Sequence, residues 1–173
     1  MTNPQLDRLR LTALTFIANH RLDESGRYRY AAGCSRPTLY SSTYAAMTRH
    51  LLGEPFVADE RAAWVAYLQA HQDDDGLFRD PVIFGQGWFK GDPLDCGRPH
   101  LSCHMVAALA CLGGVAAKPL RWLEPWRDGD ALVRWLAARD WGARVAWTGN
   151  EIMNVGVLLQ YARDCHNDSG AGR

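Results

Sequence analysis

The sequence predicts an all-α fold in which three helical hairpins follow one another along the chain. Apolar residues recur at helical spacing, as in Leu6, Leu9 and Ala13, and do not alternate as they would in a strand. A Gly-x-aromatic-Arg motif occurs twice, at residues 26–29 and 76–79. The segments after these two motifs also share a pattern of prolines, leucines and alanines, so we interpret the hairpins as copies of one unit. The three units span about residues 5–53, 58–114 and 128–165.

The first hairpin has helices predicted over 6–19 and 38–52, with the Gly-x-aromatic-Arg motif in the turn between them. Pro37 stands just before the second helix, where the N–H that proline lacks would have no helical partner. Gly53 is a favourable helix end, because glycine readily adopts the left-handed backbone that follows many helices.

The second hairpin has helices predicted over 59–70 and 100–112. Asp59 is the expected N-cap of the first of these. Pro99-x-Leu101 begins the second helix as Pro37-x-Leu39 does in the first hairpin, which aligns the two helices with an offset of 62 residues.

The third hairpin has helices predicted over 130–139 and 150–163, joined by a link over 140–149, and it lacks the acidic glycine turn. Asp130 is the expected cap of its first helix. In all three hairpins the second helix is rich in small residues, which permit close approach between helices. We therefore expect the second helices to be the inner ones.

Composition and charge exclude several classes of protein. The 173 residues suffice for one domain, over 1–166, followed by a flexible polar tail at 167–173. Nineteen basic residues balance nineteen acidic ones, so we expect no nucleic-acid partner. No apolar run reaches the roughly 20 residues of a membrane span. The five cysteines are scattered and the N-terminus lacks a secretory layout, so we expect a cytoplasmic protein with reduced thiols.

The turn at residues 72–78, Gln-Asp-Asp-Asp-Gly-Leu-Phe, resembles the Gln-x-x-x-Gly-x-aromatic signature of the α/α toroid superfamily, the fold of terpenoid cyclases and protein prenyltransferase β subunits. The resemblance covers nearly the whole chain and implies that the three hairpins form an arc of a toroid. A closed toroid has more hairpins than three, so the chain is a natural short form, a fragment or half of an assembly. Unless it is a fragment, we expect a homo-oligomer that completes the ring.

The catalytic motifs of that superfamily are not matched. The acidic run at residues 73–75 leads straight into Gly76 and forms no Asp-x-Asp-Asp motif. Asp95 and Cys96 are adjacent, whereas prenyltransferases hold zinc with Asp-x-Cys. We interpret the acidic run as a solvated turn, with a calcium loop as the alternative that its spacing disfavours.

The resemblance implies that the N-terminal ends of the inner helices line the mouth of a central cavity. We therefore take the candidate site residues from these ends and from the loop before the second inner helix. The candidates for chemistry are His100, His104, Asp95 and Glu151. The candidates for ligand binding are Tyr40, Tyr44, Trp88, Asn150 and Asn154.

His100 and His104 are four residues apart and so share one face of a helix. This spacing can chelate zinc, with Asp95, Cys96 or Cys103 as a third ligand. The usual paired-His zinc motif also has a glutamate between the histidines, which is missing here, so we predict no metal or other cofactor. Two readings remain open beside zinc: packing between helices, which we favour, and a histidine acting as a general acid or base.

Two further segments have a structural and a functional interpretation. The long connection over 80–98 contains several aromatic residues and is either a lid over the cavity mouth or packing over a helix end. Asn150, Glu151 and Asn154 either cap and brace the third inner helix or bind a ligand.

Two functions follow from these observations. The first is a non-catalytic scaffold or binding module in which the concave face of the inner helices, or the exposed flank of the last hairpin, docks another chain. The alternative is an enzyme, similar to a cyclase, transferase or lyase, that acts on a small isoprenoid-like or saccharide-like substrate. Its His, Asp and Glu side chains would lie at the N-termini of the inner helices.

Overall fold

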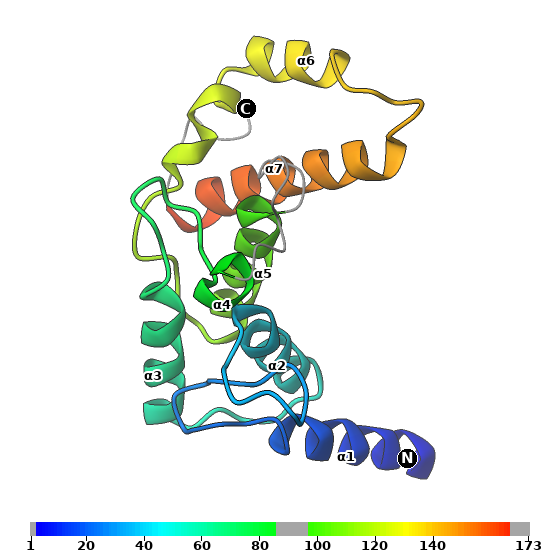
Figure 1. Ribbon diagram of the computed structural model, residues 1–173, viewed down its shortest axis with the longest axis vertical. Helices are drawn as coiled ribbons and strands as arrows, with labels where there is room; N and C mark the ends of the chain where they lie inside the picture. Colours follow the sequence, from blue (N-terminus) through cyan, green and yellow to red (C-terminus); the bar gives the residue numbers. More distant parts are fainter. Residues whose placement is uncertain (1–2, 86–96, 167–173) are drawn as a thin grey trace.

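The computed structural model describes residues 3–85 and 97–166, and within these residues the fold is all-α, which confirms the predicted class (Figure 1). The only β-type pairings in this part of the chain are isolated bridges in the turns. The predicted tail at 167–173 lies outside the described residues. The elements are α1 (Pro4–Ala18), α2 (Leu39–Leu51), α3 (Ala58–Gln69), α4 (Pro81–Gly85), α5 (Arg98–Cys111), the 3-10 helix η1 (Arg121–Trp126), α6 (Gly129–Ala137) and α7 (Val145–Cys165).

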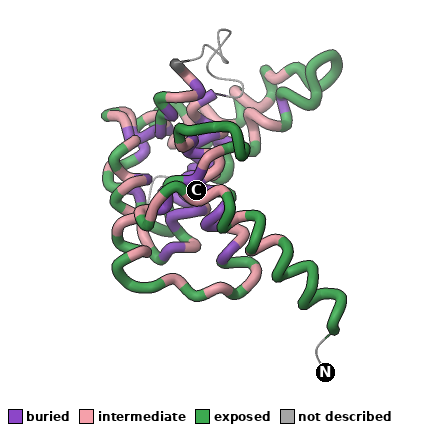
Figure 2. The backbone as a smooth tube through the Cα atoms, turned by 60° about the horizontal axis from the view of Figure 1, so that its bottom comes forward, coloured by how far each residue is buried: buried purple, intermediate pink, exposed green. Residues whose placement is uncertain are grey.

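The second helices of the predicted hairpins form a row, because α5 packs between α2 and α7. The hydrophobic core follows this row and includes the buried side chains of Leu39, Leu101, Met105 and Leu158. Helix α3 packs against α5, and η1 packs against both α6 and α7. In Figure 1, α1 and α6 lie at opposite ends of the molecule. Neither of these two helices contains a buried residue, and Figure 2 shows α1 exposed along most of its length.

Several helix ends are fixed by side-chain caps or by a glycine, of which the sequence predicted only Gly53. The Asn3 side chain accepts a hydrogen bond of 3.0 Å from the Gln5 N–H at the start of α1. The Thr38 hydroxyl accepts one of 3.2 Å from the Ser41 N–H at the start of α2. Gly53, which follows α2, has φ = 67°, in the left-handed region that only glycine adopts without strain.

Other helix ends differ from the prediction. Helix α7 begins at Val145, five residues before the predicted start, so the expected link is shorter and Trp147 is helical. The cap of α6 is Asp128, which accepts a hydrogen bond from the Asp130 N–H, and not Asp130 itself. The N-cap position of α3 is held by Val57, which makes no side-chain cap, and Asp59 lies in the first turn.

Each of the first two hairpins contains an equivalent hydrogen bond, which fixes the register of its turn against its second helix. The Ser42 hydroxyl accepts from the Tyr28 N–H at 3.1 Å, and the Ser102 hydroxyl accepts from the Phe78 N–H at 2.9 Å. In each case the second helix binds the aromatic residue of the Gly-x-aromatic-Arg turn. These serines match with an offset of 60 residues, so the offset of 62 taken from the Pro-x-Leu pairs is wrong by two residues.

Each turn glycine lies against a later segment of the chain, Gly26 against the second unit and Gly76 against the link between the second and third units. Gly26 and Gly76 have φ of 79° and 89°. A Cβ atom on Gly26 would come within 2.0 Å of Cγ of Trp64, and one on Gly76 within 2.3 Å of the carbonyl oxygen of Pro119. Glycine is therefore required at both turns for its backbone and for the close approach.

Gln72 joins its turn to a distant segment of the chain. Its amide nitrogen donates to the carbonyl oxygens of Gly76 at 2.8 Å and Lys118 at 2.7 Å, and its amide oxygen accepts from the Lys118 N–H at 2.7 Å. The ring of Phe78 is fully buried. Gln72 therefore ties the turn to the segment at Lys118, and Phe78 anchors the turn in the core.

Candidate functional site

Two tyrosines of α2 face two histidines of α5. The Tyr40 hydroxyl lies 2.8 Å from Nδ1 of His100, and the Tyr44 hydroxyl lies 3.1 Å from Nε2 of His104. Both pairs are separated by 60 residues, the same offset that relates the two hairpins. The ring centroids of His100 and His104 are 4.5 Å apart, and that of Tyr44 lies 5.2 Å from that of His104. We call these four residues the Tyr–His cluster.

The direction of one hydrogen bond in the cluster follows from geometry. Nδ1 of His104 lies 2.9 Å from the carbonyl oxygen of His100, which can only accept, so Nδ1 carries the hydrogen. In the neutral ring Nε2 then has a lone pair, and the Tyr44 hydroxyl donates to it. The oxygen of Tyr44 therefore presents only lone pairs to any other molecule.

His100 is held neutral by its surroundings. The side chain is half-buried, and burial lowers its pKa because the charged form loses solvation. The neighbouring His104 lowers the pKa further, since two imidazolium charges would repel. A neutral imidazole beside a tyrosine hydroxyl can accept a proton or a hydrogen bond.

The described residues do not gather a metal site around the two histidines. Both ring nitrogens of His104 are already in hydrogen bonds. Burial raises the pKa of Cys103 to about 12, so its sulfur is a protonated thiol and not a metal-binding thiolate. Within the part of the chain that the structure describes, no three His, Cys, Asp or Glu side chains come together as metal ligands. Asp95 and Cys96 lie outside the described residues.

Asn154 lies in the seam between α5 and α7, where it is 1% exposed. The Cys103 thiol donates to the side-chain oxygen of Asn154 at 3.5 Å. Among the described residues the side-chain nitrogen of Asn154 has no hydrogen-bond partner. This candidate ligand-binding residue is therefore packed between helices and is not open to solvent.

Glu151 joins α7 to the segment after α6. Its carboxylate accepts a hydrogen bond of 2.9 Å from Arg139, whose guanidinium lies over the ring of Trp135 with 4.9 Å to the centroid. Glu151 lines a small pocket of about 200 Å³ with Arg139, Asp140 and other residues, none of which belongs to the Tyr–His cluster. Asn150 precedes it on α7 and is half-buried.

Of the candidate residues, the structure brings together Tyr40, Tyr44, His100 and His104. The described partner of Glu151 is Arg139, after α6, and that of Asn154 is Cys103 on α5. Asp95 and Trp88 lie outside the described residues, as does most of the segment predicted as a lid.

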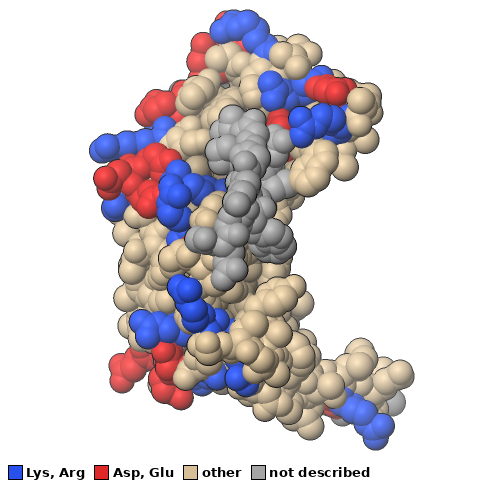
Figure 3. All heavy atoms as spheres, viewed as in Figure 1, with Lys and Arg blue, Asp and Glu red and all other residues tan. Residues whose placement is uncertain are grey.

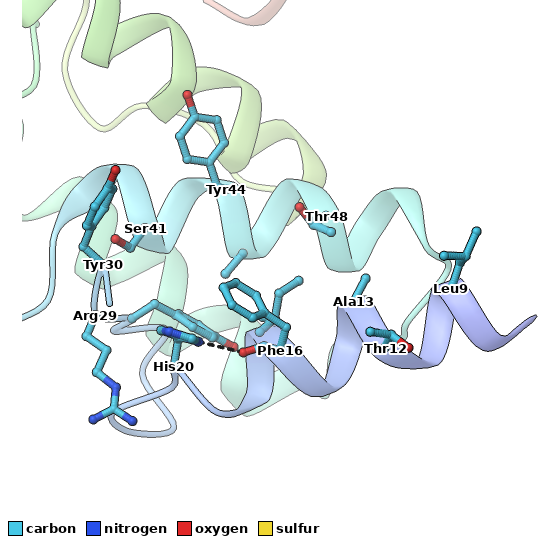
Figure 4. Close-up of a pocket in the computed structure, with 13 residues that line it drawn as sticks. Leu9, Thr12, Ala13, Phe16, His20, Arg29, Tyr30, Ser41, Tyr44 and Thr48 are labelled. Carbon is cyan, nitrogen blue, oxygen red and sulfur yellow. Dashed lines mark hydrogen bonds between the residues drawn. The ribbon is translucent and has the colours of Figure 1, made fainter. Parts of the chain in front are cut away.

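A groove between α1 and α2 adjoins the cluster (Figure 4). Its volume is about 590 Å³, and we call it the α1–α2 groove. Tyr44 belongs to both the groove and the cluster. Figure 3 shows that the surface over α2 carries few charges and that the outline of the molecule is hollowed between α1 and α6. The groove is lined by Leu9, Thr12, Ala13, Phe16, Ile17, His20, Tyr28, Arg29, Tyr30, Ser41, Tyr44, Ala45 and Thr48.

Sequence reasoning missed this groove because it treated the first helix only as packing. One signal was present: α1 has more apolar residues than one packed face can bury. Leu6, Leu9, Leu11 and Phe16 all remain exposed in the structure.

The acidic run at residues 73–75 and the buried Asp80 both hold helix ends in place. Asp75 accepts a hydrogen bond of 2.9 Å from the Arg98 guanidinium at the start of α5, so the acidic run forms a turn that braces a helix. Asp80, which the sequence did not single out, is fully buried. Its carboxylate accepts from the N–H groups of Val82 at 2.7 Å and Leu39 at 2.6 Å, and so holds the first turns of α4 and α2.

Comparison with known proteins adds no family to this geometry. No family model, curated protein or solved structure matches the chain. Within residues 3–85 and 97–166, no helix combines the length and the apolar character that crossing a membrane requires. The function has to be inferred from the cluster and the groove.

Proposed function

We propose that this protein is a non-catalytic binding module that holds a small, mainly apolar molecule beside its row of second helices. The observation that carries the proposal is the α1–α2 groove, which opens next to the Tyr–His cluster and shares Tyr44 with it. The groove would hold the apolar part of the ligand, and the cluster would offer polar groups at its edge.

The size and lining of the groove support this function. Pockets for small molecules typically have volumes of roughly 300–1,000 Å³ and are lined by apolar and aromatic side chains with a few polar groups. The α1–α2 groove has about 590 Å³ and is lined mostly by apolar and tyrosine side chains, with Phe16 and Ile17 on one wall and Ala45 on the other.

The proposal includes the architecture suggested by the toroid signature. In it, the three hairpins form an arc with α2, α5 and α7 inside, and a second copy of the chain in the cytoplasm completes the ring. The packing of α5 between α2 and α7 supports the arc. The matched serine hydrogen bonds of the first two hairpins support the repetition on which it depends.

The test is a fluorescence titration with the neutral dye Nile red. We expect saturable binding of one dye per chain and blue-shifted emission. Ala13→Trp, which places an indole in the groove from α1, should weaken binding at least about tenfold, since it fills volume that the dye needs. Leu11→Trp is the matched control, because Leu11 is exposed on the same helix and does not line the groove.

Two results would contradict this function. One is the absence of saturable binding by the unmodified protein. The other is equal binding by the Ala13→Trp and Leu11→Trp variants, with both folded as judged by circular dichroism.

One observation favours the enzyme as a second candidate. His100 has a lowered pKa and lies 2.8 Å from the Tyr40 hydroxyl, so it is a neutral imidazole that can act as a general base. The substrate would be a small isoprenoid-like or saccharide-like molecule at the Tyr–His cluster. If a turnover is detected, it should be lost in His100→Ala and His104→Ala, and its persistence in both variants would remove this candidate.

A further inference from the structure

We propose that the α1–α2 groove prefers a neutral apolar molecule with a hydroxyl group, an alcohol, over the same apolar body with an ether or a carboxylate. This inference rests on the proposed function and names the ligand class of the same groove. Its basis is the direction of the hydrogen bonds made by His20, Thr12 and Tyr44, three residues that line the groove, which leaves each of them a lone pair that can accept.

His20, at the end of α1, presents an acceptor. Its Nδ1 lies 2.8 Å from the carbonyl oxygen of Phe16. A carbonyl can only accept, so Nδ1 carries the hydrogen and Nε2 of the neutral ring has a lone pair. The ring also packs against Phe16, with 4.4 Å between centroids, which fixes its orientation.

Two hydroxyl groups of the groove donate within the protein. The Thr12 hydroxyl donates to the carbonyl oxygen of Arg8 at 2.9 Å. The Tyr44 hydroxyl donates to Nε2 of His104 at 3.1 Å, because Nδ1 of His104 carries the hydrogen and Nε2 has the lone pair. Thr12 belongs to the α1 wall and Tyr44 to the α2 wall, and Figure 4 shows the Tyr44 hydroxyl turned away from α1, so this acceptor lies at the edge of the groove on the side of α5.

The remaining polar groups do not reverse this preference. The hydroxyl groups of Ser41, Tyr30 and Thr48 can rotate to donate or accept, and that of Ser41 already shares a hydrogen bond of 2.6 Å with Thr38. A ligand hydroxyl can pair with any of them.

The charges of the lining residues favour a neutral ligand. Among the described lining residues only Arg29 carries a permanent charge. Its Nη2 donates to the carbonyl oxygen of Asn19 at 2.8 Å, and Figure 4 shows its guanidinium pointing away from the groove. The described lining includes no Asp or Glu to pair with an ammonium group. A carboxylate would lose water and meet lone pairs, which is unfavourable in an apolar site.

The experiment compares ligands that differ only in their polar group. Decanol, its methyl ether and decanoate are titrated against the full chain with bound Nile red. We expect decanol to displace the dye at about a five- to tenfold lower concentration than the ether, as one hydrogen bond to a partly buried acceptor implies. Decanoate should displace it least.

Variants connect the preference to the named acceptors. In the double variant His20→Phe, Tyr44→Phe the rings remain while two acceptors are removed, so the preference for decanol over its ether should become smaller. His71→Phe is the matched control, because His71 makes the same Nδ1 contact to a main-chain carbonyl, that of Tyr67 at 2.9 Å, and does not line this groove.

The outcomes separate this inference from the function on which it rests. If the dye binds but decanol and its ether displace it equally, or decanoate displaces it best, the preference for an alcohol is wrong and the binding function stands. If the double variant keeps the full preference, the assignment to His20 and Tyr44 is wrong. If neither dye nor alcohol binds, the binding function itself fails.

Discussion

Arg49 and Glu60 form a charged pair that joins α2 to α3 inside the protein. Nη1 of Arg49 donates to the carboxylate of Glu60 at 2.6 Å, and the guanidinium lies 4.7 Å from the centroid of the Phe56 ring. The side chain of Glu60 is only 9% exposed. Burial alone would raise the pKa of Glu60, but the hydrogen bond and the charge of Arg49 outweigh it, so the pKa is below its ordinary value.

Replacement of this carboxylate should destabilise the protein. In Glu60→Gln the buried guanidinium loses its closest counter-charge, and Glu54 at 3.4 Å compensates only in part. We expect the free energy of unfolding at pH 7 to fall by about 3 kcal/mol, measured by urea denaturation. The control is Asp74→Asn, which removes a fully exposed partner of Lys118 and should leave the midpoint nearly unchanged.

The same pair gives a dependence of stability on pH. The folded pKa of Glu60 is below the unfolded one, so its contribution is fully present above the unfolded value and is lost as the pH falls through the folded value. Part of the acid destabilisation of the unmodified protein should therefore be missing in Glu60→Gln. Equal losses of stability between pH 7 and pH 3 in the two proteins would contradict this assignment.

At the level of elements, the turns hold the hairpins to one another. The prediction concerns Gly76, whose left-handed φ and contact with Pro119 leave no space for a side chain. Gly76→Ala should lower the free energy of unfolding by at least about 2 kcal/mol. Gly33→Ala is the matched control, since nothing lies within 4 Å of a Cβ atom there, and it should change stability by less than about 0.5 kcal/mol. Similar melting temperatures for the two variants would show that the turn tolerates a side chain.

The longer helices could be predicted from the sequence because each is marked by periodic apolar residues and a recognisable end. Helix α2 begins one residue after the predicted start, at Leu39, with Thr38 as its cap. The short elements α4 and η1 could not be predicted, because tertiary contacts determine them. Helix α4 depends on the buried carboxylate of Asp80, which also accepts a hydrogen bond from the Leu39 N–H of α2, 41 residues earlier in the chain.

The candidate site could be predicted only where the repeat itself brings residues together. Tyr40 and His100 occupy matching positions of the neighbouring helices α2 and α5, so placing both at helix starts was enough to bring them into contact. Glu151 was expected beside them, but its described partner is Arg139, which the early start of α7 brings within reach. The groove could not be predicted from periodicity, because it depends on how far α1 stands from α2.

For the whole molecule, the two ends of the structure expose apolar residues. Leu6 on α1 is 62% exposed and Val133 on α6 is 64% exposed. If a second copy completes the ring, these ends are buried, and light scattering should give twice the monomer mass of 19.3 kDa. A monomer at high concentration would argue strongly against the ring.

Charge at either end should then dissociate the dimer. Leu6→Glu and Val133→Glu place a carboxylate in opposite ends of the arc, so each alone should yield the monomer. Val57→Glu is the control, because Val57 is exposed before α3 and belongs to neither end. A dimer that survives both end variants would require a different interface.

The contact of each turn glycine with a later segment of the chain gives the chain a polarity. Gly26 receives Trp64 of the second unit, and Gly76 receives the segment at Pro119 that leads into the third. Among the described residues, no turn glycine makes this contact with the unit before it. The surface that carries the glycine therefore differs from the surface that packs onto it. A new unit could therefore be duplicated into the chain without altering the existing contacts, because it would bring one surface of each kind. For the same reason two copies could form a closed ring only head to tail, with two identical interfaces related by one twofold axis.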